Sequence, residues 1–154
     1  MSLRIRSEAF EPDGEIPERY TCDSTDRSPP LSWSGLPAGT ESLVLIVDDP
    51  YAPDPAAPTR TLVHWVLINL PTTISGLPEA ASPLPSGTLS GLNDWQRTGY
   101  GGPCPPIGRH RYFFKLYALD GRLALRGRPT KADVEQTMRG HVLAEAVLMG
   151  TYRR

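Results

Sequence analysis

The stretch Thr61-Leu-Val-His-Trp-Val-Leu-Ile-Asn-Leu70 predicts a central β-strand. Side chains alternate between the two faces of a strand, and both alternating sets in this stretch are mainly apolar. A strand that is apolar on both faces is typical of a sheet that is covered on both sides. This stretch therefore predicts a mainly β fold in which further layers pack on a sheet.

Two further strands are predicted, one before and one after this stretch. The apolar run Leu43–Val47 leads into Asp48-Asp49-Pro50, and we expect this strand to end at Asp49 because proline stops a strand. The segment His110–Leu119 alternates, is rich in aromatic residues and is followed by the turn signal Asp120-Gly121. This segment predicts a third core strand.

Proline-rich segments predict the connections. Residues 50–60 carry four prolines and predict a stiff loop. Residues 71–108 hold seven prolines and seven glycines in 38 positions. A connection of that length is unusual inside a compact domain, and such loops tend to be functional.

One long helix is predicted near the end of the chain. Thr130 and Asp133 fit a capping arrangement, residues 131–149 lack proline, and Gly150 follows them. We therefore expect a helix over residues 131–149, with His141 in its middle as a packing or surface residue.

The composition fits one domain over residues 1–154. With 16 basic and 17 acidic residues the net charge is −1, so no basic surface for nucleic acid or anionic lipid is indicated. No apolar stretch is long enough to cross a bilayer, and no amphipathic basic helix or lipidation motif is present. We expect no stable membrane insertion.

The N-terminal residues and the two cysteines predict the compartment. The first residues lack the apolar core of a secretory signal, which predicts a cytoplasmic location. Cys22 and Cys104 lie far apart without C-x-x-C spacing, so neither a zinc site nor a redox dithiol is indicated. In a reducing compartment we expect two free thiols. A disulfide between them stays open, because the sequence does not give their distance.

The predicted strand order brings polar side chains to one edge of the sheet. If the strands ending at Asp49 and starting at Thr61 are antiparallel neighbours, Asp49 and His64 lie close together. If the third strand runs parallel to the second, His110 adds another imidazole, and Tyr112 shares its face. Such a cluster can bind phosphate or carboxylate, because protonated histidines donate charge-assisted hydrogen bonds. We expect a small anion as ligand.

Other interpretations of these residues stay open. Periodicity alone predicts that His64 is a core histidine bonded to a backbone carbonyl. Two histidines and a carboxylate also match a metal triad, and Cys104 could be a thiol activated by His110. As an enzyme, the chain would use Asp49 and a histidine as acid and base on a phosphoester or acyl substrate. No Gly-x-Ser-x-Gly motif is present to supply a serine nucleophile.

Short motifs along nearly the whole chain match those of one known family in their order. The strongest are Asp49-Pro-Tyr-Ala-Pro53, Val63-His64-Trp65, Gly99-Tyr-Gly-Gly-Pro-Cys-Pro-Pro106 and Gly108-Arg-His110-Arg-Tyr112. Further matches are Tyr20-Thr-Cys-Asp23, Ser28-Pro-Pro-Leu31 with Trp33, Gly140-His-Val-Leu-Ala-Glu145 and Gly150-Thr-Tyr152. In these motifs the chain resembles the phosphatidylethanolamine-binding protein family, in its prokaryotic, Raf-kinase-inhibitor-like branch.

This resemblance implies a fold and a function. It implies a large antiparallel sheet packed on a smaller one with few helices, and a pocket for phosphate-like anions that needs no metal or cofactor. The family's pocket positions carry over to Asp49, His64, Gly102, Pro103, His110 and Tyr112. It also implies a non-enzymatic binding or regulatory protein, with a kinase or protease as the target to be inhibited.

Three departures from the family bear on the ligand and the pocket mouth. Tyr51 replaces the second aspartate of the usual Asp-Pro-Asp-Ala-Pro, and Cys104 stands where animal relatives have proline. The chain stops at Arg154, without the extra helix that borders the pocket in those relatives. We therefore expect a more open pocket mouth, or one that is covered by a second copy in a homodimer.

Overall fold

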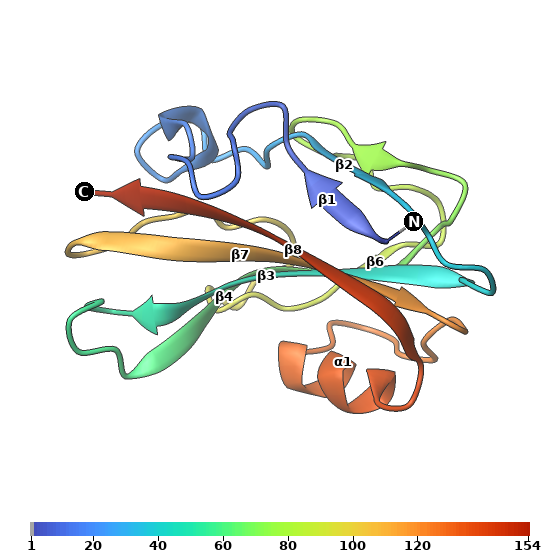
Figure 1. Cartoon of the computed structure of the whole chain (residues 1–154). Coiled ribbons are helices and arrows are strands. Elements are labelled where there is room, and N and C mark those ends of the chain that lie inside the picture. The colour runs from blue at the N-terminus through green and yellow to red at the C-terminus, as the bar shows by residue number, and fades with distance from the viewer. Residues whose placement is uncertain (1) are drawn as a thin grey trace.

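Two antiparallel sheets and one α-helix form three layers in residues 2–154, the part of the chain that the computed structural model describes (Figure 1). The large sheet lies in the middle, with the small sheet on one face and the helix on the other. The small sheet consists of β1 (Arg4–Arg6), β2 (Leu31–Ser34) and β5 (Gly76–Leu77). The large sheet has the order β6 (Leu89–Ser90), β4 (Arg60–Leu70), β3 (Ser42–Ala52), β7 (Arg109–Leu119) and β8 (Val142–Arg153). The predicted mainly β fold with a large and a smaller antiparallel sheet is confirmed.

The three predicted core strands lie side by side. β3 pairs with β4 on one side and with β7 on the other, both antiparallel. β4 and β7 therefore run in the same direction, and both start at the edge where β3 ends. β3 continues past Asp49 to Ala52, so the expected end at Asp49 is wrong by three residues. The pairing is irregular between Asp49 and Ala52, and such an irregularity accommodates a proline that cannot donate a hydrogen bond.

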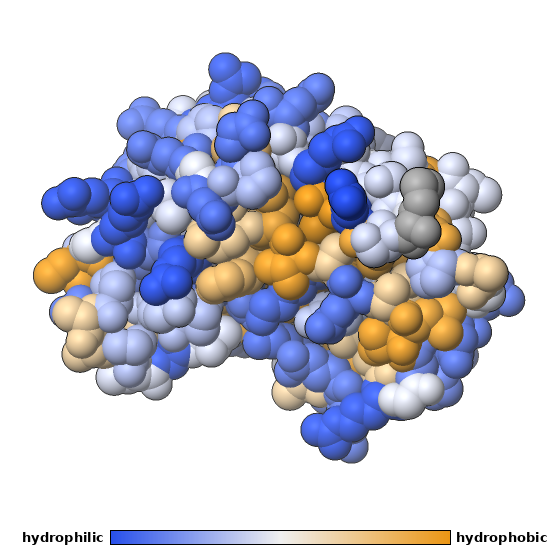
Figure 2. All heavy atoms as spheres, in the orientation of Figure 1, coloured by the Kyte–Doolittle hydropathy of each residue, from blue (hydrophilic) through white to orange (hydrophobic). Residues whose placement is uncertain are grey.

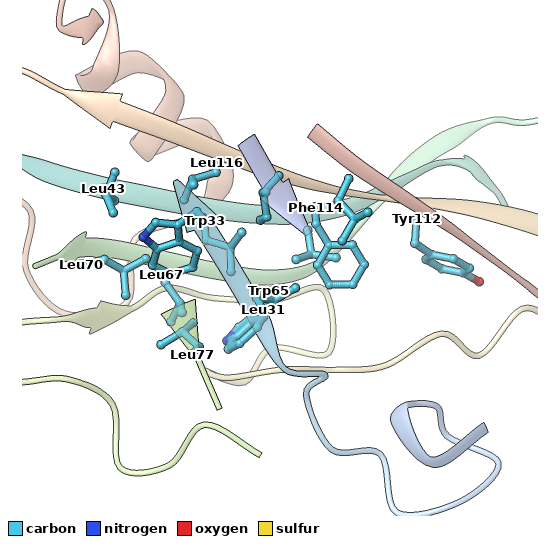
Figure 3. Close-up of a cluster of buried hydrophobic side chains, with 14 of the residues drawn as sticks. Leu31, Trp33, Leu43, Trp65, Leu67, Leu70, Leu77, Tyr112, Phe114 and Leu116 are labelled. Atoms are coloured by element: carbon cyan, nitrogen blue, oxygen red, sulfur yellow. The ribbon is translucent and has the colours of Figure 1, made fainter. Parts of the chain in front are cut away.

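Both faces of the large sheet are buried at its strands β3 and β4, as the sequence of β4 predicts. Figure 3 shows the larger apolar cluster between the two sheets, where Trp33 of β2 meets Trp65 and Leu67 of β4 and Phe114 of β7. A smaller cluster joins the opposite face of the large sheet to the helix α1 (Lys131–Met138). Trp65 and Leu67 of β4 belong to the larger cluster and Val66 and Ile68 to the smaller one, which explains why both faces of this part of the strand are apolar.

The expected helix over residues 131–149 is wrong in its second half. Its start is confirmed, because Thr130 Oγ1 accepts a hydrogen bond from the Asp133 amide and the Asp133 carboxylate accepts one from the Thr130 amide. α1 ends at Met138, Gly140 adopts a φ of 81°, and β8 begins at Val142. β8 pairs with β7 along its length, and this long-range pairing outweighs the helix propensity of its residues. His141 lies exposed in the turn, with its Nδ1 2.9 Å from an Asp120 carboxylate oxygen.

The expected free thiols are also wrong. Cys22 and Cys104 form a disulfide, with their Cα atoms 5.4 Å apart. The loops that carry them are distant in sequence but meet in space. Cys104 is therefore not a free thiol nucleophile in this form of the protein.

None of the helices among residues 2–154 is both long and apolar enough to cross a membrane.

Candidate functional site

A cavity of about 160 Å³ lies at the edge of the large sheet where β3 ends and where β4 and β7 begin. Its polar wall consists of Asp49, Arg60, His110 and Tyr112. Its other lining residues are Ala52, Pro53, Leu62, Cys104, Pro105 and Pro106. The cavity is thus largely apolar with a few polar groups, which is the usual character of a small-ligand site.

Asp49 and His110 form a buried pair in the wall of this cavity. The His110 Nδ1 atom lies 2.5 Å from Asp49 Oδ2, and both side chains are almost completely buried. The other ring nitrogen, Nε2, lies 2.9 Å from the carbonyl oxygen of Ile107. The carbonyl of Ile107 accepts from Nε2–H, and one proton lies between Nδ1 and the Asp49 carboxyl. Whichever of the two groups holds that proton, the Asp49–His110 pair carries no net charge.

His64 lies deeper in the protein, behind the cavity. Its Nδ1 atom donates to the carbonyl oxygen of Gly101 at 2.6 Å. Burial lowers the pKa of His64, although the hydrogen bond to Gly101 opposes this shift. The neutral ring then carries a lone pair on Nε2, and this buried atom has no hydrogen-bond partner among the described residues. Such an atom is rare in folded proteins.

Tyr112 lies between the two imidazoles. Its ring centroid is 5.2 Å from that of His64, edge to face, and 6.3 Å from that of His110, nearly parallel. Burial raises the pKa of the Tyr112 hydroxyl well above its usual range, and the nearby Asp49 charge adds to the shift. The hydroxyl therefore stays protonated and can donate a hydrogen bond into the cavity that it lines.

Gly102 and Pro103 stand behind the cavity and do not line it. The Gly102 amide donates to Asp26 Oδ1 at 2.8 Å, and the Pro103 carbonyl accepts from the Cys22 amide at 3.1 Å. A Cβ atom at Gly102 would collide with the Tyr20 carbonyl and the Asp26 carboxylate. Glycine at this position thus lets two loops approach each other closely. Of the six predicted positions, Asp49, His110 and Tyr112 meet at the cavity, while His64, Gly102 and Pro103 lie behind it.

Sequence reasoning missed several residues around the cavity. Arg60, the first residue of β4, brings a positive charge to the wall and lies 3.4 Å from an Asp94 carboxylate oxygen. Trp95 covers His64, with ring centroids 5.2 Å apart. A basic residue directly before an apolar strand was a visible signal for Arg60. The sequence held no such signal for Trp95, which lies in the long connection.

The metal interpretation needs three ligands in one place. Within residues 2–154 no group of three or more histidine, cysteine or acidic side chains lies close enough to hold a metal ion. The Nε2 atom of His110 is also engaged by Ile107, so it is not free to bind a metal in this arrangement.

Comparisons with known proteins identify the family of the chain. Residues 6–153 match the family model for phosphatidylethanolamine-binding protein. A UPF0098 protein of Methanothermobacter thermautotrophicus is 50% identical over 155 residues, which cover 99% of each chain. A UPF0098 protein of Aquifex aeolicus is 44% identical, over 99% of this chain and 89% of that one.

Two solved structures share the whole fold. One is a putative phosphatidylethanolamine-binding protein homolog, CT736, from Chlamydia trachomatis, with a TM-score of 0.91, 40% identity and coverage of 99% of this chain and 98% of that one. The other is YbcL of E. coli, described as a new member of the mammalian family, with a TM-score of 0.90, 29% identity and coverage of 100% and 99%. The fold and the site define a small β-rich protein with a largely apolar cavity at a sheet edge, in which a few polar groups meet. The chain belongs to the phosphatidylethanolamine-binding protein family.

Proposed function

We propose that the cavity binds a small anion of the phosphate or carboxylate type, and that the protein acts by binding and not by catalysis. The observation that carries this proposal is the charge of the wall. Among the charged lining residues, the Asp49–His110 pair carries no net charge, so Arg60, whose side chain is 55% exposed, supplies the positive charge at the cavity mouth. Its ion pair with Asp94 is exposed and therefore weak, so the guanidinium can turn toward an anion that enters the cavity.

Each polar group has a distinct part in this proposal. The Tyr112 hydroxyl donates a hydrogen bond to the anion, and Arg60 provides a charge-assisted one. His110 does not contact the anion directly, because Asp49 and Ile107 already engage both of its ring nitrogens, and the pair holds the wall in place. Behind them, the unpartnered Nε2 of His64 can take up a proton when negative charge enters the cavity.

The size of the cavity limits the ligand. Its volume of about 160 Å³ is below the roughly 300–1,000 Å³ of ordinary small-molecule sites. It can enclose a phosphate or carboxylate head group, while the rest of a larger ligand stays outside. The names of the family and of the Chlamydia trachomatis homolog also indicate binding and name no reaction.

Titration with inorganic phosphate and with phosphoethanolamine tests the proposal. We expect saturable NMR shifts of the His64 and His110 imidazole signals. Tyr112→Phe should weaken binding about ten-fold or more, which is the effect of removing one hydrogen bond to a charged group. Arg60→Gln should also weaken it. Arg111→Gln is the matched control, because Arg111 is exposed and its guanidinium stacks over the Tyr51 ring outside the cavity wall.

Two results would contradict the proposal. The first is the absence of any imidazole shift at millimolar phosphate. The second is turnover on a panel of phosphoesters and esters that is lost in Asp49→Asn and His110→Gln, since this would favour the acid–base hydrolase.

The protein partners stay predictions. Inhibition of a kinase or protease is one of them, and capture of such an enzyme by the purified protein is its test.

A homodimer is the other, and the exposed Val142, Leu143 and Val147 on the outer strand β8 support it. Figure 2 shows apolar surface along the course of this strand. Light scattering should give twice the monomer mass, and Val147→Lys should lower it.

The cytoplasmic location is also a prediction. The disulfide between Cys22 and Cys104 bears on it, because such bonds are usually kept reduced in that compartment.

A further inference from the structure

The disulfide joins the cavity wall to a second loop. Cys104 lines the cavity, and Cys22 follows the 3₁₀ turn η1 (Glu18–Tyr20). Three hydrogen bonds run beside this bond: Cys22 N to Pro103 O at 3.1 Å, Gly102 N to Asp26 Oδ1 at 2.8 Å, and Tyr100 Oη to Tyr20 O at 2.6 Å. The position of the cavity wall at Cys104 thus depends on the loop that carries Cys22.

The two sulfur atoms have different surroundings. Cys22 is an exposed residue, whereas Cys104 is only half-exposed. The Nη1 atom of Arg154 lies 3.5 Å from Cys104 Sγ. Arg154 is held there by Asp23, whose other carboxylate oxygen accepts a hydrogen bond from the Tyr152 hydroxyl. A guanidinium at this position favours a thiolate on Cys104, and a better leaving thiolate speeds exchange.

We propose that this disulfide is a thiol–disulfide exchange site for small thiols and that its opening weakens anion binding in the cavity. A thiolate of the small thiol attacks Cys22 Sγ, and a new sulfur–sulfur bond forms there. The Cys22–Cys104 bond breaks, and its electron pair leaves on Cys104 as a thiolate that Arg154 stabilises. A second molecule of the small thiol then releases Cys22 as a thiol and leaves as the oxidised disulfide of that reagent.

The link to the cavity rests on the proposed function. Without the bond, residues 104–106 of the wall lose their covalent tie to the loop at Cys22. An anion must then order this wall when it binds, and such ordering costs affinity. Opening the disulfide should therefore lower the affinity for phosphate without removing the groups that bind it.

The exchange step is tested first, because it does not depend on any ligand. The oxidised protein is incubated with glutathione in its folded state, the reaction is quenched with acid, and peptides are analysed by mass spectrometry. We expect the glutathione adduct on Cys22. Arg154→Gln should slow its formation about two- to five-fold, the range that an exposed charge interaction supplies, and the exposed neighbour Arg153→Gln is the matched control. An adduct on Cys104, no adduct below the unfolding transition, or equal rates in both variants would overturn this step.

The coupling to the cavity is tested by phosphate titration of the oxidised protein, the reduced protein and Cys22→Ser. We expect about ten-fold weaker binding in the last two, with spectra that still show a folded protein. Equal affinity in all three forms overturns the control of the cavity but leaves the proposed function intact. A reduced protein that unfolds also overturns it, because the bond is then purely structural. If the oxidised protein does not bind phosphate, the proposed function fails, and the adduct on Cys22 alone then decides whether the exchange site exists.

Discussion

Two neighbouring aspartates of β3 are both buried, but they differ in the partners that neutralise them. Asp49 faces the cavity, where it pairs with the imidazole of His110. Asp48 faces the layer of α1, where one of its oxygens lies 3.0 Å from Lys115 Nζ and 2.8 Å from Lys131 Nζ. Its other oxygen, Oδ1, has no hydrogen-bond partner among the described residues.

This difference distinguishes an aspartate that can respond to a ligand from one that only stabilises the fold. His110 is fixed between Asp49 and the carbonyl of Ile107, while the two lysines reach Asp48 from the surface along partly exposed side chains. We therefore expect ligand effects on the side of Asp49, and effects on stability alone on the side of Asp48.

The largest effect is expected for Asp49→Asn. This change breaks the buried pair of Asp49 and His110, and we expect the free energy of unfolding to fall by about 3 kcal/mol, at the low end for a broken buried pair. Urea unfolding at pH 7 measures it. If Asp49→Asn lost less unfolding free energy than Asp48→Asn, the buried pair with His110 would contribute less to stability than the contacts of Asp48 with the two lysines.

Asp48→Asn should have a smaller effect. Lys115 and Lys131 keep side-chain exposures of 28% and 19%, so both ammonium groups can turn toward water when the carboxylate is removed. We expect a loss of about 2 kcal/mol in unfolding free energy and an unchanged phosphate affinity. Weaker phosphate binding in this variant would show that the two faces are coupled and would break the comparison.

The parts of the fold that the sequence predicted are those with a strong local pattern. β4 and β7 follow from their apolar and aromatic alternation, and the start of α1 follows from its capping box. The second half of the expected helix failed because residues 142–149 contain good helix formers. Only their pairing with β7, which no local window contains, turns them into a strand.

The candidate site also contains some features that the sequence predicts and others that it does not. Asp49 and His110 were predicted to converge because the first strand ends, and a third strand parallel to the second begins, at the same edge of the sheet. That the strands of these two residues pair directly is seen only in the structure. The contact of Gly102 with Asp26 and the disulfide of Cys104 with Cys22 join residues that are 76 and 82 positions apart through loops. Loop paths of that length depend on the packed structure, and the sequence pattern does not encode them visibly.

Acid should weaken the protein through His64. Its pKa is lowered in the folded state, so the unfolded chain takes up a proton first as the pH falls below the ordinary value of about 6.5. Stability is therefore complete above that value and declines below it. Between pH 7.5 and 5.5 we expect wild type to lose about 1 kcal/mol more than His64→Gln. Parallel urea unfolding curves for the two proteins at both pH values measure this, and equal losses would remove His64 as the cause.

The smallest effect is expected for Lys131→Ala. Lys115 still neutralises Asp48 after this change, and α1 loses a cation from its first turn, where the helix dipole disfavours positive charge. These two effects should leave a net loss of only about 0.5 kcal/mol in the free energy of unfolding. Lys115→Ala is the matched control, because it removes the other ammonium group without touching the helix. A loss for Lys131→Ala as large as that of Asp48→Asn would mean that one lysine cannot neutralise Asp48, and that this face of the sheet is held as rigidly as the one at His110.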